Sequence, residues 1–199
     1  MPVKRIFDVD LTADVRALMA MTAALTPYIY DSEIFGTLND NSLPRLTIGG
    51  ILMRLHRLKH LSGTLTAAQK SALESAASKF AEVRQQWIVH YERKISREIL
   101  SRIGSLDQFA NECAQNLAVC ADNYPAAMEK RVMIEHLRDE LEALNLLSTE
   151  ITGRLAALDN ALNRCLEAGE FCWSPHVQAA YPKEKFWFLY QAVRKPVQK

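Results

Sequence analysis

The chain has 199 residues, of which 49% are hydrophobic and 24% are charged, and its formal net charge is +1. This near-neutral total excludes a strong overall attraction to nucleic acid, so any binding of anions has to come from a local patch. The 7 glycines and 7 prolines are too few for a turn-rich β architecture, and no apolar run approaches the roughly 20 residues of a membrane-spanning helix. We therefore expect a helical protein without a membrane partner.

Helical periodicity begins at Leu11, where apolar residues recur at steps of three, four or seven, as they do on one face of a helix. Pro27 and the polar stretch after it end this pattern, and we expect residues 31–46 to form a loop. Thr47 then suits an N-cap and Gly63 suits a left-handed helix end. These two signals predict a second, short helix between them.

A long helix is predicted over about residues 66–103. The sequence TAAQ at its start is a capping box, and an apolar stripe continues without glycine or proline up to Gly104. At 1.5 Å per residue such a helix would be about 57 Å long. A second capping box, SLDQ, follows Gly104 directly, so we expect the chain to turn back sharply there.

A second long helix is predicted over about residues 126–167. Pro125 suits its first turn, and a heptad-like apolar series continues from Leu137 to Cys165 without a phase slip. A break near NLLST, which would give two antiparallel helices, is the alternative. Together the patterns predict an all-α, elongated helical bundle that forms a single domain over residues 1–199, with or without a projecting hairpin of long helices.

The end of the chain is rich in aromatic residues, since residues 171–190 hold seven of the 16 phenylalanines, tyrosines and tryptophans. Such large side chains bury roughly 150–250 Å² each when they are covered. We predict that this segment folds back and packs on the bundle. The alternative is a contact surface for another subunit or a protein partner, made by Trp173, Tyr181, Trp187 and Tyr190.

Four cysteines, Cys113, Cys120, Cys165 and Cys172, lie in two pairs that each have a spacing of seven residues. This spacing matches no C-x-x-C metal or redox motif. The opening stretch MPVKRIFDVDLTADV lacks the pattern of a signal peptide, so we expect a reducing, cytoplasmic compartment and buried free thiols. Disulfides are the alternative.

The segment GGILMRLHRLKHL carries a local excess of positive charge, because no aspartate or glutamate occurs from Asn41 to Leu73. On a helical wheel Arg57 and His60 fall opposite the apolar side, which favours an anion-binding or partner surface. Its candidate residues are Arg45, Arg54, Arg57 and Lys59. The alternative is that these side chains pair within the protein with the acids between Glu135 and Glu150.

Histidines on several helices raise the alternative of a metal site formed by His56, His60, His90 and His136. The segment lacks the H-E-x-x-H motif, because Arg57 stands where the glutamate would be, and no Glu-x-x-His pair of a di-iron bundle occurs. We therefore expect no cofactor.

The sequence thus predicts a non-enzymatic helical module for protein–protein interaction or scaffolding, either self-associating or bound to a protein partner. Two alternatives stay open. One is a metal-dependent enzyme that uses histidines from several helices, and the other is an anion or nucleic-acid binder that uses the basic helix face.

Overall fold

The computed structural model describes residues 7–194 and confirms an all-α protein. Among these residues the strands are β1 (Leu166–Ala168) and β2 (Gln191–Val193), which pair antiparallel with Leu166 opposite Val193. The chain divides into two compact units. Unit 2 comprises Asp10–Ile99 and Glu135–Leu146, and the described part of unit 1 comprises residues 7–9, 100–134 and 147–194. The prediction of a single domain over residues 1–199, with or without a projecting hairpin, stays a prediction.

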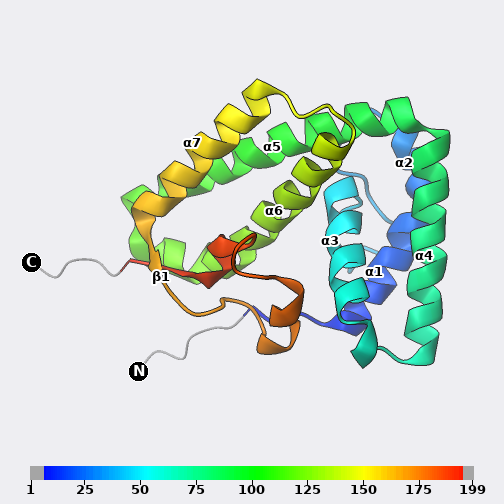
Figure 1. Cartoon of the computed structure of the whole chain (residues 1–199), viewed down its shortest axis with the longest axis horizontal. Coiled ribbons are helices and arrows are strands. Elements are labelled where there is room, and N and C mark those ends of the chain that lie inside the picture. Colours follow the sequence, from blue (N-terminus) through cyan, green and yellow to red (C-terminus); the bar gives the residue numbers. More distant parts are fainter. Residues whose placement is uncertain (1–6, 195–199) are drawn as a thin grey trace, which may run out of the picture. The chain divides into compact units, whose positions relative to one another are not determined.

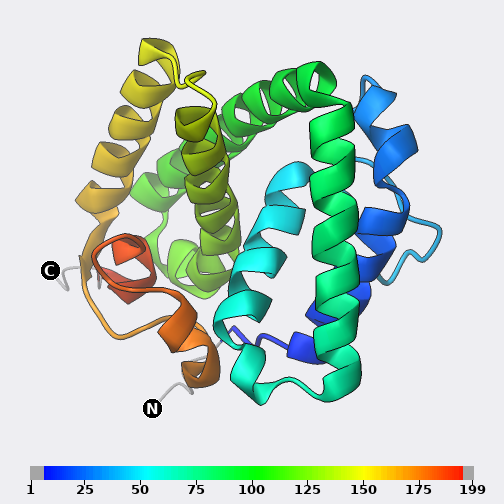
Figure 2. The same ribbon diagram turned by 45° about the vertical axis from the view of Figure 1, so that its right-hand side comes forward.

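Unit 2 is built mainly from α1 (Leu11–Ala23), α3 (Ile48–His60) and α4 (Ala67–Gln86), which pack against one another (Figure 1). Figure 2 shows the same three helices side by side from a second direction. Short helix α2 (Leu25–Tyr30) and the 3-10 turn η1 (Ser62–Thr64) complete the connections. Apolar side chains between these elements are buried, among them Leu18, Met21, Ile48, Ile51, Leu58 and Phe80.

Side chains cap the helices of unit 2, as the sequence predicts for two of them. Thr47 accepts a hydrogen bond from the backbone N–H of Gly50 at the start of α3. Thr66 and Gln69 form the reciprocal capping box of α4. Asp10, which the periodicity did not single out, accepts from two backbone donors at the start of α1. Each cap satisfies donors that a helix start leaves without an intrahelical partner.

The predicted helix over 66–103 is wrong in its bounds, because Trp87 ends α4 and a new helix, α5 (Ile88–Gln115), begins directly after it. No glycine or proline marks this corner. The β-branched Ile88 and Val89 have lower helix propensity, and the Trp87 ring packs edge-on against Tyr30 at 4.4 Å. Tertiary packing therefore decides the bend.

The turn predicted at Gly104 is also wrong, because α5 continues through it to Gln115. A Cβ added at Gly104 would meet no atom within 4 Å, so this glycine lies at an open helix position. A single exposed glycine weakens a helix by about 1 kcal/mol without ending it. The chain bends instead at Asn116, between α5 and α6 (Leu117–Ala143).

The prediction of one long helix over about residues 126–167 is also wrong. The structure contains the two-helix alternative, with α6 and α7 (Thr149–Cys165) as separate helices. Asn145 takes a left-handed conformation with a φ of 57°, and the N–H of Leu146 donates to the carbonyl of Leu141. Asparagine tolerates this Schellman-type ending better than most residues. Ser148 then caps α7 by accepting from the N–H of Ile151.

Unit 1 holds the aromatic segment, which is packed as predicted (Figure 1). Trp173 and Tyr181 are fully buried, with ring centroids 5.2 Å apart, and the Trp173 indole N–H donates to the carbonyl of Pro125 at 2.7 Å. These two residues therefore cannot form a contact surface, whereas Trp187 and Tyr190 are only half-buried. The 3-10 helices η2 (Pro175–Ala180) and η3 (Trp187–Tyr190) carry the rest of the segment.

In the described residues no helix is both long enough and apolar enough to cross a membrane.

Two charged side chains of α5 are buried in unit 2. The Glu98 carboxylate accepts from the backbone N–H groups of Ile48 and Gly49 at 2.9 and 3.1 Å, so it binds the N-terminus of α3. The Lys94 ammonium donates to the carbonyls of Tyr28 and Glu33. Burial lowers the pKa of Lys94 to about 8.

We expect the free energy of unfolding to rise by about 2 kcal/mol between pH 7.5 and 9.5, because the unfolded chain keeps a proton on Lys94 that the folded protein loses above pH 8. Urea unfolding at several pH values measures this rise. The variant Lys94→Met should lack it, whereas Lys70→Met, at an exposed position of α4, should keep it. An equal rise in both variants would contradict the assignment to Lys94.

Candidate functional site

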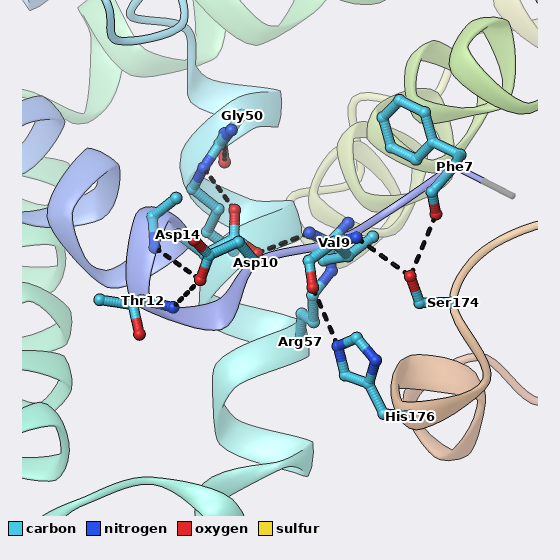
Figure 3. Close-up of polar contacts among 11 residues, drawn as sticks. Phe7, Val9, Asp10, Thr12, Asp14, Gly50, Arg57, Ser174 and His176 are labelled. Atoms are coloured by element: carbon cyan, nitrogen blue, oxygen red, sulfur yellow. Dashed lines mark hydrogen bonds and ion pairs between the residues drawn. The ribbon is translucent and has the colours of Figure 1, made fainter.

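The centre of the predicted basic surface is buried. Arg57 is 1% exposed, and its Nη1 lies 2.6 Å from Oδ2 of Asp14, while Nε of Arg54 lies 3.0 Å from Oδ1 of the same carboxylate (Figure 3). The wheel placed Arg57 away from the core, and this was wrong because α1 covers that side of α3. Both arginines thus pair within the protein with Asp14 of α1, and pairing with the acids between Glu135 and Glu150 stays a prediction.

The other two residues of that set are exposed. Arg45 makes a long 3.4 Å hydrogen bond from Nη1 to the carbonyl of Phe35, outside any helix. Lys59 lies near the C-terminal end of α3 and has no ion pair within the described part of the chain. The four predicted residues therefore do not act as one patch.

Unit 2 contains an open groove of about 850 Å³, which we call the histidine groove. Side chains from α3, α4, the start of α5 and the end of α6 line it. Apolar residues form much of its wall, chiefly Leu52, Leu55, Phe80 and Ile88. Its polar residues are His56, Lys59, His60, Arg84, Gln85, His136, Asp139 and Glu140.

Three of the four predicted histidines meet in this groove. The His56 ring lies 4.1 Å from the His60 ring and 4.6 Å from the His136 ring, measured between centroids. Nδ1 of His60 lies 2.9 Å from the carbonyl oxygen of His56 one helical turn earlier, which fixes the orientation of that imidazole. His90 is not part of the cluster, because it packs beside Tyr30 and Trp87.

This cluster is not arranged as a metal site. Within residues 7–194 no group of three or more histidine, cysteine, aspartate or glutamate side chains has the geometry to hold a metal ion. The contacts between the imidazoles are ring to ring, with interplanar angles of 41° for His56 and His60 and 46° for His56 and His136. The predicted grouping is thus partly present, and metal binding by it stays a prediction.

The acids of the groove are bound by partners inside unit 2. Oε2 of Glu140 lies 3.0 Å from both Nε and Nη2 of Arg84 and accepts a 2.8 Å hydrogen bond from the Tyr91 hydroxyl. Burial of Tyr91 and the neighbouring Glu140 carboxylate raise the pKa of this hydroxyl, so it stays a donor. Asp139 lies 3.3 Å from Nη2 of Arg138. Both acids of the groove thus have a cationic partner, and Arg138 is shared with Glu135, whose Oε1 lies 2.7 Å from the same Nη2.

Sequence reasoning missed Phe80, Arg84 and Glu140 as groove residues. Phe80 was identified only as part of an apolar stripe, and Arg84 and Glu140 lie 56 residues apart on helices that carry many charges. The positions of these helices depend on the break at Trp87, which no glycine or proline in the sequence predicts.

Ser174 and His176 of unit 1 lie close together, and both form hydrogen bonds with Val9 in the N-terminal stretch (Figure 3). The Ser174 hydroxyl donates to Oδ1 of Asp8 at 2.8 Å and accepts from the N–H of Val9. Nε2 of His176 lies 2.9 Å from the carbonyl of Val9, so it does not contact the serine as a general base would. These bonds tie the start of unit 1 to η2.

Comparisons of the chain with protein-family models, with curated proteins and with solved structures gave no match.

Replacing Asp14 by asparagine should lower the free energy of unfolding by about 3–5 kcal/mol, because Arg54 and Arg57 would stay buried without the carboxylate that offsets their charge. Urea unfolding measures the loss. Glu74→Gln, which neutralises an exposed acid of α4, should change stability little. A small loss for Asp14→Asn would show that the arginines find other partners.

Replacing Glu140 by glutamine should cost about 1–3 kcal/mol, since the buried Tyr91 hydroxyl and the Arg84 guanidinium lose a charged acceptor. The matched control is Glu142→Gln, two residues further along α6 and exposed. Equal stabilities of the two variants in thermal unfolding would contradict a structural role for the Arg84–Glu140–Tyr91 network.

Proposed function

We propose that the histidine groove of unit 2 binds a small anionic molecule with an apolar part, and that the protein is a binding module and not an enzyme. The observation that carries this proposal is an asymmetry of charge. The acids of the groove have cationic partners inside unit 2, whereas Lys59 has no ion pair among the described residues.

Three histidines add polar groups to the lining of the groove. His56, His60 and His136 lie in ring contact, so the groove offers polar imidazole groups as well as the Lys59 cation. Lys59 and His60 are exposed, so the Lys59 ammonium and the His60 imidazole lie within reach of a ligand from solvent.

The apolar wall favours a ligand that is not purely ionic. Leu52, Phe80 and Ile88 line the groove beside the cationic residues. A volume of about 850 Å³ lies within the roughly 300–1,000 Å³ common for small-molecule sites. A carboxylate or phosphate on an apolar skeleton would satisfy both kinds of lining.

A second candidate function is the protein–protein interaction expected from the sequence. The observation in its favour is a group of exposed apolar residues in unit 2, Tyr30, Phe35 and Val89. Light scattering over a dilution series tests self-association, and a particle that stays monomeric would restrict this function to other partners. We also propose a cytoplasmic location, and binding of nucleic acid is a further alternative.

The variant Lys59→Glu should weaken binding of octanoate about tenfold, because it replaces a cation that lines the groove by an anion. Isothermal titration calorimetry measures the affinity. The control Lys70→Glu makes the same charge change on an exposed residue outside the groove and should bind like the wild type. Octyltrimethylammonium, which has the same chain and the opposite charge, should bind more weakly than octanoate. Equal affinities for the two probes, or equal effects of the two variants, would overturn the proposal.

A further inference from the structure

Two cysteines of unit 1 are joined across the junction of two helices. Cys113 lies in the last turn of α5 and Cys120 in the first turn of α6, and a disulfide connects them across Asn116. The expectation of free thiols is therefore wrong for this pair. The seven-residue spacing works because the chain bends at Asn116, which brings the two Cα atoms within 4.8 Å.

A third cysteine packs against this pair. Cys165, the last residue of α7, is a buried free thiol, and it forms one packed cluster with Cys113 and Cys120. Phe109, Leu117 and Val193 lie around the cluster. The fourth cysteine, Cys172, is also a buried thiol outside any disulfide, but it is not in this cluster. The fold therefore brings together three sulfurs from three helices.

We propose that Cys113, Cys120 and Cys165 form a thiol–disulfide exchange site in which Cys165 is the attacking thiol. Its thiolate attacks one sulfur of the Cys113–Cys120 bond, a new disulfide to Cys165 forms, and the other cysteine leaves as a thiolate. The leaving thiolate takes up the proton that Cys165 lost. Because one disulfide replaces another, no electrons are gained or lost. Complete reduction of the bond takes two electrons and two protons from an external dithiol.

The exchange would change which elements are joined. The disulfide now ties α5 to α6, and a bond to Cys165 would tie α7 to one of them. Cys165 directly precedes β1, and its carbonyl accepts from the backbone N–H of Arg194 beyond β2. The Nε of Arg194 also donates to the carbonyl of Leu166. The site therefore lies where the C-terminal strand pair joins α7.

Two features of the cluster favour exchange over a permanent bond. The attacking thiol and the disulfide belong to one chain, so the effective concentration of the thiol is far above that of a small thiol in solution. In a cytoplasmic protein, as we propose here, disulfides are typically transient and take part in redox chemistry.

Disulfide mapping of the full-length chain tests the proposal. The variants Cys120→Ser and Cys113→Ser each leave one partner for Cys165. Each is oxidised in a glutathione buffer, quenched with acid, alkylated with N-ethylmaleimide and digested without reduction for mass spectrometry. We expect a Cys113–Cys165 link in the first variant or a Cys120–Cys165 link in the second, at least about tenfold more abundant than any link to Cys172.

The variant Cys172→Ser is the matched control, since it removes a buried thiol outside the cluster and should keep the Cys113–Cys120 bond. Absence of a Cys165 link from both variants, or equal linking to Cys172 or to glutathione, would overturn the proposal. If circular dichroism shows that the variants have lost their helices, the wild type decides. During partial reduction by dithiothreitol it should yield a cross-linked peptide containing Cys165, and its absence would equally overturn the proposal.

Discussion

Helix α3 carries two arginines into the interior of unit 2, and the packing around it depends on how their charge is offset. Burying an unpaired charge costs several kcal/mol, so Asp14 of α1 has to face Arg54 and Arg57 when the two helices pack. The N-terminus of the same helix is bound by Glu98 of α5. Two acids from different parts of the chain thus position α3, which apolar contacts alone would allow to rotate or slide.

The histidine groove follows from this arrangement. With its arginines turned toward α1, α3 presents His56, Lys59 and His60 to the other side, where α4 and the end of α6 line the groove. The Arg84–Glu140–Tyr91 network holds that opposite wall. The charge available to the proposed ligand is therefore what remains after the internal pairs have formed.

Composition and periodicity were enough for the all-α class, for the short helix from Thr47 and for the capping box at Thr66, because these depend on local signals. They failed where contacts between residues far apart in the sequence determine the structure. Trp87 bends the chain through its contact with Tyr30, and Arg57 is buried because α1 supplies Asp14. The break between α6 and α7 at Asn145 is only the alternative in the sequence pattern, because the apolar series continues through it without a phase slip. The meeting of three histidines depends on these long-range contacts.

The corner at Trp87 joins α4 to α5 without a connecting loop. A helix turns by about 100° for each residue, so one inserted or deleted residue there would rotate every following side chain around the axis of α5. Tyr91, Lys94 and Glu98 would then all face away from their partners at once. The chain between α4 and these three residues therefore has a fixed length, and natural variation in length should be confined to the loops, such as the one that precedes α3.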